Sequence, residues 1–437
     1  MSSPRVVITG LGAVSPLGLT SKQLWQGICE GACGIAAITA FDPIGFPCKI
    51  AGQVPPFKVN DFVPKSSRKA VKLMSRDIEL SVVAALEAIT QSGLKTKGID
   101  PENVAVNPER MGINLGAGLI SCDLAELAPA AAASIENGSF DIHKWGTNGL
   151  PLVTPLWLLK YLPNMLPCHI GLIHDIQGPS NTITCGESAA LIAVGEAVGI
   201  ITRGSADIMV AGGAEAKVNP ILIIRQILLN RATTQNNDTP SEACRPFDAD
   251  AKGSVFGEGA GILVLENLEH ASARSADILA EVAGFGQSSS INPDYQNIES
   301  DGKGIAIAIQ KALADAEITP DQLDLVIPHG TGIPHDDAAE SNAIGLVLGD
   351  AVHDVPVFAP KSMLSNTGAA SGALDIVLAV NAIRDGVIPA SKNFRRPNGC
   401  RLNINQNKIT KDIKHVLCCS YTYGGQTAAM VLKKYNG

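Results

Sequence analysis

The sequence lacks the features that mark several large classes of protein. Only 17% of its 437 residues are charged, the formal net charge is −8, and no run of five or more Lys or Arg occurs. Binding to nucleic acid needs clustered positive charge, so nucleic acid is not an expected partner. The most apolar stretch, residues 150–159, ends at Lys160, well short of the roughly 18 residues of a membrane helix. The sequence therefore predicts no membrane span.

Two further absences concern the compartment and metals. The N-terminal residues enter a strand-like run at once, without the charged and apolar regions of a secretory signal. The ten cysteines contain no CxxC pair, so we expect reduced thiols, a cytoplasmic protein and no zinc site. Four histidines have no neighbours at metal-ligand spacing, and no metal or permanently bound cofactor is predicted. These are His143, His169, His174 and His335.

Short β-branched runs alternate with helix-length segments along the chain. The 43 glycines and 46% hydrophobic residues fit a compact α/β protein. Strands are predicted at 5–9, 208–211, 261–265, 323–327, 355–359, 416–419 and 428–432. Helices are predicted at 77–92, 188–203, 304–316 and 372–385. This alternation predicts mixed sheets covered by helices.

The order of the predicted elements divides the chain into two halves. We place them at residues 1–260 and 261–437. A less regular segment at about 116–178, with prolines at its centre, is predicted to be an insertion of loop and short helices packed on the main body.

Residues 178–203 have the pattern strand, sharp turn, Ala-rich helix. This is the geometry of a nucleophile elbow. Unsatisfied N–H groups at a helix N-terminus favour negative charge, so a residue at the turn could act as a thiolate, an oxyanion or a carboxylate. An ordinary capped helix is the alternative that this motif alone leaves open.

Seven motifs occur in one order along nearly the whole chain. They are RVVITGLGAVSPLG from Arg5, GSADIMVAGGAE from Gly204, RPFD from Arg245 through GEGAG from Gly257, PHGTG from Pro328, KSM from Lys361, GAASG from Gly368, and YGG from Tyr423. In this order they resemble the β-ketoacyl-ACP synthases of type II fatty acid and polyketide synthesis. The resemblance implies a thiolase-like, five-layered αβαβα fold in two pseudo-duplicated halves with mixed sheets.

The resemblance also implies a catalytic set, which this sequence keeps only in part. Family members hold the acyl chain on a cysteine, and two histidines help to decarboxylate malonyl-ACP. Counting back 17 residues from Gly204, the cysteine position is occupied by Glu187. His329 matches the first histidine, while Asn366 stands at the second. An amide cannot exchange a proton near neutral pH as imidazole does.

A rival alignment makes Cys185 the nucleophile. It needs two extra residues before Gly204, which would rotate the following helix by about 200°. A buried structural thiol is therefore the preferred interpretation of Cys185.

Other family positions are retained or altered. Lys361 is present, and the resemblance implies that it fixes a supporting carboxylate, for which Glu340 is the match. In the channel for the phosphopantetheine arm, Thr331 is kept, but Ile333 replaces a threonine and removes a hydroxyl donor.

The gate is altered as well. Thr422 replaces the first glycine of this loop, and Tyr423 follows at the gate and oxyanion position. Loss of that glycine restricts the backbone freedom that a gate would use.

The resemblance implies acyl carrier protein as a partner, with its phosphopantetheine arm as substrate carrier. A basic cluster on a predicted helix matches the family's docking region, and electrostatic steering suits a transient acidic partner. A solvated helix face is the alternative. The cluster comprises Lys65, Arg68, Lys69 and Lys72.

Three functions are compatible with these residues. The preferred hypothesis is a condensation-inactive subunit of chain-length-factor type, paired with an active ketosynthase; a homodimer remains possible. The second is a malonyl-ACP decarboxylase, or another acyl-ACP enzyme, using His329, Asn366 and a protonated Glu187. The third is a condensing enzyme that uses Cys185 after a local rearrangement.

Overall fold

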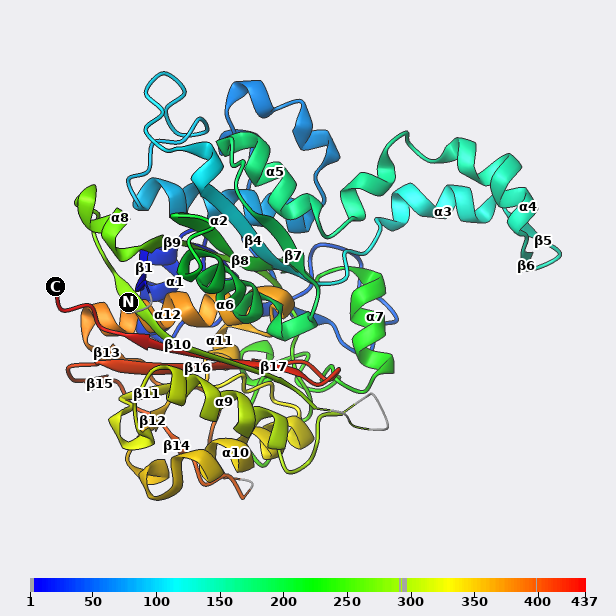
Figure 1. The fold of residues 1–437 in the computed structure, drawn as a ribbon. Helices are drawn as coiled ribbons and strands as arrows, with labels where there is room; N and C mark the ends of the chain where they lie inside the picture. Colours follow the sequence, from blue (N-terminus) through cyan, green and yellow to red (C-terminus); the bar gives the residue numbers. More distant parts are fainter. Residues whose placement is uncertain (1–3, 291, 293–296, 398) are drawn as a thin grey trace.

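The computed structural model describes residues 4–290, 292, 297–397 and 399–437. Its helices and strands stack in alternating layers, helix, sheet, helix, sheet, helix, from top to bottom of Figure 1. The predicted αβαβα arrangement is confirmed.

Each sheet layer is mixed, and both repeat one pairing pattern. The first runs in the order β1 (Val6–Val14), β9 (Glu258–Asn267), β8 (Ile208–Ala216), β4 (Met111–Ala117), β7 (Ser180–Ile183). The second runs β10 (Ala280–Ser289), β17 (Gln426–Lys433), β16 (His415–Tyr421), β11 (Leu325–Ile327), β12 (Pro356–Val357), β14 (Asn403–Ile404). From β1 and from β10 outward, the first four pairings are antiparallel, antiparallel, parallel and parallel.

The two layers are joined through β1 and β10, which pair over three residues, 6–8 with 280–282. The boundary predicted at 260/261 falls inside β9, which belongs wholly to the first layer. Along the chain, the layers therefore meet between β9 and β10 instead. The strands β4 and β10 were not among the predicted ones.

Helices fill the other three layers. One outer layer holds α2 (Arg76–Gln91) and α5 (Met165–His174), the other holds α9 (Lys303–Asp315) and α10 (Pro334–Leu348), and the middle layer holds α6 (Ala189–Thr202) and α12 (Ser371–Asp385). A Cβ at Gly12 of β1 would lie 1.9 Å from the carbonyl oxygen of Ala84 in α2. Only glycine lets this helix approach the sheet so closely.

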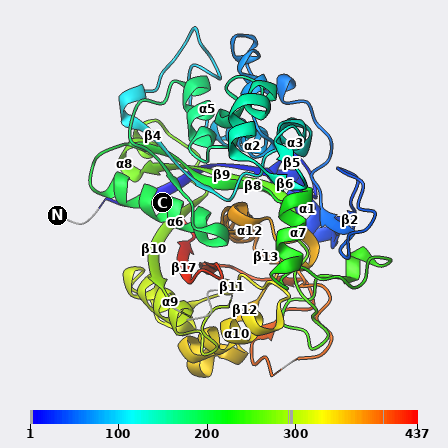
Figure 2. The same cartoon turned by 90° about the vertical axis from the view of Figure 1, so that its right-hand side faces the viewer.

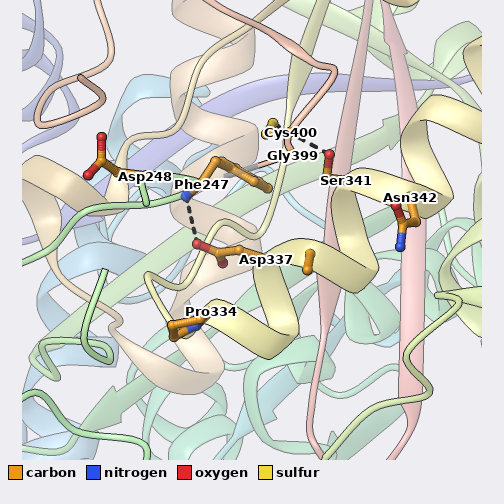
Figure 3. A pocket seen from close by; sticks show the side chains of 9 residues that line it. Phe247, Asp248, Pro334, Asp337, Ser341, Asn342, Gly399 and Cys400 are labelled. Carbon is orange, nitrogen blue, oxygen red and sulfur yellow. Dashed lines mark hydrogen bonds between the residues drawn. The ribbon is translucent and has the colours of Figure 1, made fainter. Parts of the chain in front are cut away.

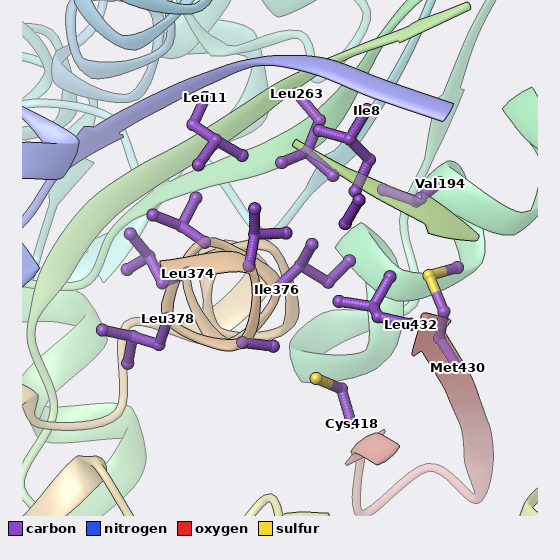
Figure 4. Packing of buried hydrophobic residues seen from close by; sticks show 14 of the residues in the cluster. Ile8, Leu11, Val194, Leu263, Leu374, Ile376, Leu378, Cys418, Met430 and Leu432 are labelled. Carbon is purple, nitrogen blue, oxygen red and sulfur yellow. The ribbon is translucent and has the colours of Figure 1, made fainter. Parts of the chain in front are cut away.

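The middle-layer helix α12 lies in the centre of the core. Its residues from 371 to 383 are all buried, as expected of a helix that is hydrophobic on every side. In Figure 4, Leu374, Ile376 and Leu378 of α12 lie among side chains from both sheet layers, among them Leu11 and Met430. Burying each such side chain contributes about 2 kcal/mol. The turn that precedes α12 is thus attached to a fully buried helix at the centre of the core.

The insertion departs from prediction. It was expected to pack on the main body, and α5 does so, but the part from α3 (Leu124–Ala132) to a 3-10 turn at Trp157–Tyr161 extends away from it as an arm (Figures 1 and 2). The arm also holds β5 (Ile135–Glu136), β6 (Ser139–Phe140) and α4 (Ile142–Lys144). Its apolar side chains are largely exposed, because the arm has no core of its own to bury them.

The remaining elements are short. They are α1 (Ser21–Glu30), α7 (Pro220–Leu228), α8 (Leu268–Ala273), α11 (Lys361–Leu364), β2 (Ile35–Ala37), β3 (Ile50–Gly52), β13 (Val387–Ile388) and β15 (Ile409–Thr410). Within the described residues, no helix combines the length and apolar character needed to cross a bilayer.

Candidate active site

Glu187 lies in a tight turn between β7 and α6. The turn is a 3-10 helix, Gly186–Ser188, and Gly186 has φ +55°, a conformation that favours glycine. The Ser188 hydroxyl donates to the Cys185 carbonyl at 2.8 Å, and the Ser420 hydroxyl of β16 donates to the Glu187 carbonyl at 2.7 Å. The Glu187 side chain is 2% exposed. The strand, turn and helix predicted for this segment are present, with a carboxylate buried at the turn.

A lysine shares its charge between two buried carboxylates at this turn. The Lys217 ammonium, at the end of β8, lies 3.6 Å from Glu187 Oε1 and 3.3 Å from Glu215 Oε1. Burial raises the pKa of Glu187, but the charges of Lys217 and Arg231 outweigh it and lower the pKa to about 2. Burial together with the negative Glu187 raises the pKa of Glu215. Glu187 is therefore ionised at neutral pH.

Arg231 fixes the loop that carries Tyr423. Its guanidinium donates to Asp336 Oδ2 at 2.6 Å and stacks over the Tyr423 ring at 4.8 Å. The Arg225 guanidinium also donates to the Tyr423 hydroxyl at 3.1 Å, and Thr422 packs against Gly186, where a Cβ would meet Thr422 Oγ1 at 2.7 Å. The predicted gate is thus held by two arginines and by the elbow itself.

His329 follows β11 and is fully buried. Its backbone N–H donates to Glu340 Oε1 at 2.6 Å, and its ring lies edge-on to the Tyr421 ring at 4.7 Å. The Nδ1 atom is 3.5 Å from the Ser420 hydroxyl, which links His329 to the Glu187 turn. Burial and the charge of Lys361 lower the pKa of His329 well below its usual value, so the imidazole is neutral.

The direct ion pair of Lys361 is with Asp375 and not with Glu340, on which Lys361 acts through its charge alone. The Lys361 ammonium lies 3.4 Å from Asp375 Oδ2 in α12. Glu340 instead accepts from the backbone N–H groups of His329 and Gly330. Burial raises the pKa of Glu340 to about 8, so at neutral pH this carboxyl is favoured in its protonated form. Sequence order alone could not distinguish the two acidic residues.

Asn366 lies between α11 and α12 and is fully buried. Its backbone N–H donates to the Val255 carbonyl, and its carbonyl accepts from the Gly257 N–H. Its Oδ1 accepts from the Gly368 N–H at 2.9 Å. In the described part of the chain, its Nδ2 has no hydrogen-bond partner. The amide donor of Asn366 is therefore unused within the described residues.

Thr331 and Ile333 lie in the loop after His329 and are buried. The Thr331 hydroxyl donates to Asp337 Oδ1 at 3.0 Å and accepts from the Ile333 N–H at 3.0 Å. Asp337 also accepts from the backbone of Phe247, and it lines a separate cavity of about 190 Å³ beside α10 (Figure 3). The hydroxyl proton of Thr331 is thus used within the loop, so Thr331 has no free donor for a bound pantetheine arm.

A second cavity, of about 400 Å³, opens onto the Glu187 turn. Its wall includes Glu187 and Cys185, together with Lys217, Gln226 and Tyr423. Cys185 is only partly buried, and burial raises the pKa of its thiol. The predicted burial of this thiol is wrong in part: Cys185 packs against the core on one side and lines the cavity on the other.

The basic cluster is exposed but does not form the predicted helix. Lys65, Arg68, Lys69 and Lys72 lie on two 3-10 turns, Lys65–Ser67 and Ala70–Leu73, and their neighbours. Among the histidines, His169 and His174 are buried, and His174 Nδ1 lies 2.8 Å from the Thr96 hydroxyl. No group of His, Cys, Asp or Glu in the described residues has the arrangement of a metal site.

Sequence reasoning missed Lys217, Glu215, Arg231 and Asp375. Glu215 is the last residue of the motif GSADIMVAGGAE, and Lys217 follows it by two residues. The signal was available: a buried carboxylate at an elbow needs a counter-charge, and a lysine at the end of a strand-like run is unusual for a buried strand.

Comparisons with known proteins agree with this architecture. Residues 3–271 match the model of the β-ketoacyl synthase N-terminal domain, and residues 279–395 match its C-terminal domain. The chain is 33% identical over 441 residues to 3-oxoacyl-(acyl-carrier-protein) synthase 2 of Vibrio cholerae serotype O1, covering 99% of this chain and 100% of that protein. It is 32% identical over 437 residues to the Staphylococcus aureus (strain COL) protein of the same name, covering 99% and 98%.

Solved structures of ketosynthases superpose on nearly the whole chain. The ishigamide ketosynthase/chain length factor superposes with a TM-score of 0.84 at 29% identity, covering 100% of both chains. A β-ketoacyl synthase from Burkholderia phymatum gives 0.85 at 27%, covering 99% of this chain and 100% of the other. A type II polyketide ketosynthase solved with its acyl carrier protein gives 0.83 at 26%, covering 100% of both. The chain belongs to the β-ketoacyl-ACP synthase family and has the thiolase-like fold.

Proposed function

We propose that this chain is a condensation-inactive subunit of chain-length-factor type, which pairs with an active ketosynthase and helps to form the acyl tunnel. The observation that carries the proposal is the Glu187 carboxylate, buried at the elbow and ion-paired with Lys217. Holding a chain as a thioester requires a thiol, which a carboxylate cannot supply. The neutral His329 remains, but Asn366 at the second position cannot transfer a proton.

Two features of the surface support a second subunit. The arm exposes apolar side chains that a monomer would leave in water, including Phe140 (57% exposed) and Ile142 (65%). The strand β7 is the last strand of its layer, so one edge of its backbone is open for pairing. We infer a heterodimer with a ketosynthase, and the native mass of the assembly distinguishes it from a homodimer.

Carrier protein is the proposed second partner. The exposed basic cluster fits an acidic partner that binds transiently, and one structural relative was solved with its acyl carrier protein. The phosphopantetheine arm would then bring acyl groups to the cavity of about 400 Å³. No permanently bound cofactor is part of this proposal.

Each of the two alternative functions needs a side chain in a protonation state that its surroundings disfavour. Decarboxylation through a protonated Glu187 is disfavoured, because Lys217 and Arg231 lower its pKa to about 2. Condensation through Cys185 needs a thiolate, whereas burial raises the pKa of that thiol.

The test is intact-protein mass spectrometry after incubation with acyl-ACP and malonyl-ACP, with and without a co-purified ketosynthase. We expect no acyl adduct on this chain, an adduct on the partner, and a product length that changes when this chain is present. An adduct on this chain that is lost in Cys185→Ala would contradict the proposal. Carbon dioxide release by this chain alone would instead identify a decarboxylase.

A single restoring substitution sharpens the test. Glu187→Cys places a thiol next to Lys217, whose charge lowers the thiol pKa and should make it react with iodoacetamide at pH 7. We nevertheless expect at most slow acyl transfer, because Asn366 still cannot move a proton. Appreciable condensation by this variant would disprove our account of Asn366.

A further inference from the structure

Lys217 is a buried cation for which the family resemblance provides no role. Its side chain is 7% exposed, lines the cavity of about 400 Å³ and lies over the Phe256 ring at 5.5 Å. Both of its charged neighbours belong to this chain, at 3.3 Å and 3.6 Å. Its charge is therefore already neutralised before any ligand enters.

The buried charges around the elbow leave no positive charge in excess. Two buried cations face three buried carboxylates, and the neutral His329 adds nothing. The cations are Lys217 and Arg231, and the carboxylates are Glu187, Glu215 and Asp336. A ligand carboxylate that reached the elbow end of this cavity would lose its hydration and find both buried cations already paired. Arg225, a further cation of the cavity wall, is exposed and donates to the Tyr423 hydroxyl.

Two polar atoms of the wall that have no hydrogen-bond partner point to the same ligand chemistry. Glu187 Oε1 and Gln226 Oε1 are buried, line the cavity and have no hydrogen-bond partner within the described residues. Both atoms are acceptors. The end of the wall at Glu187 and Gln226 is thus suited to an apolar group or to an N–H or O–H donor, and unsuited to another carboxylate.

We propose that Lys217, through its ion pair with Glu187, determines which acyl groups the cavity admits: uncharged acyl thioesters enter, and those with a free carboxylate are excluded. Glu187 occupies the position at Lys217 that a ligand carboxylate would otherwise take. This inference rests on the proposed function only in assuming that the cavity receives acyl groups.

Removing the charge of Glu187 should expose the anion site. The Glu187→Gln variant keeps the side-chain shape but releases Lys217 from one of its two carboxylates. We expect sodium malonate, measured by isothermal titration calorimetry at pH 7, to bind this variant at least tenfold more tightly than wild type. The Glu187→Gln/Lys217→Met double variant should lose the gain, because the cation is gone.

Malonamide is the matched neutral probe, and its affinity should be similar in all three proteins. The inference is overturned if wild type binds malonate as tightly as Glu187→Gln, or if the double variant keeps the gain. Circular dichroism and the thermal midpoint of each variant establish that it is folded. An acyl adduct found by mass spectrometry would refute the proposed function without changing the malonate titration, so the two failures are distinguishable.

Discussion

Two turns in the middle of the molecule have the same construction and different contents. The turn Gly186–Ser188 leads into α6, and the turn Gly368–Ala370 leads into α12. Both are 3-10 helices that begin with a glycine at positive φ, +55° and +60°. At the second position one presents Glu187 and the other Ala369, whose N–H donates to Glu215 Oε2 at 2.7 Å.

The comparison separates what the fold requires from what the chemistry requires. Both turns need a glycine because a helix must start abruptly beside a sheet. The side chain that follows is free to vary, provided that its charge is balanced. Glu215 and Lys217 connect the two turns: Glu215 accepts from the Ala369 N–H, and Lys217 balances the charge of Glu187.

The largest effect is expected when the counter-charge is removed. Lys217→Met leaves Glu187 and Glu215 buried without their shared cation, which should cost about 3–5 kcal/mol. Adding Glu187→Gln should recover part of this loss, because one uncompensated charge is removed. Urea denaturation of the two variants and wild type measures both steps. A loss below about 1 kcal/mol for Lys217→Met would show that the ion pair does not stabilise the elbow.

The second prediction compares the two turn glycines directly. Alanine at either position incurs the cost of positive φ, about 1–2 kcal/mol. At Gly368 the new Cβ would also lie 1.8 Å from Glu215 Oε2, whereas at Gly186 the nearest atom is Thr422 Oγ1 at 2.7 Å. Gly368→Ala should therefore be the more destabilising by at least about 1 kcal/mol in the same urea assay. Equal losses would mean that Glu215 moves away freely.

The sequence allowed the turn before α6 to be predicted, and much of the fold with it. The periodicity of 372–385 and 188–203 placed both middle helices to within a residue or two, because a completely apolar helix has few alternatives to burial. The Lys361 partner could not be predicted in the same way. Glu340 and Asp375 are both buried acids near it, and only the packing of α12 brings Asp375 within 3.4 Å. The arm was also misjudged, since exposed apolar residues look like core in a sequence.

The third prediction uses pH to separate Glu187 from the other buried acids. Its folded pKa of about 2 lies below the unfolded value of about 4.3. Its contribution to stability is therefore present above pH ~4.3 and is lost as the pH falls toward 2. The stability difference between wild type and Glu187→Gln should shrink over this range, by at most about 1.4 kcal/mol for each pH unit. Asp77, whose raised pKa does not involve Glu187, is common to both proteins and cancels. Glu215 does not cancel completely, because the charge of Glu187 helps to raise its pKa. A difference independent of pH would show that Glu187 is not ionised when folded.

The smallest effect is expected two residues from Glu187. Cys185 is partly buried, and no charged partner holds it. Cys185→Ala should cost less than about 1 kcal/mol in urea denaturation, and it should leave acyl loading of a ketosynthase partner unchanged. Both side chains line the same cavity. The smaller loss of stability expected for Cys185→Ala than for Lys217→Met therefore follows from their difference in burial and charge. If Cys185→Ala were instead the variant that abolished acyl loading, the thiol rather than the carboxylate would be the reactive group of this elbow, and the Glu187–Lys217 pair would serve only to position the turn.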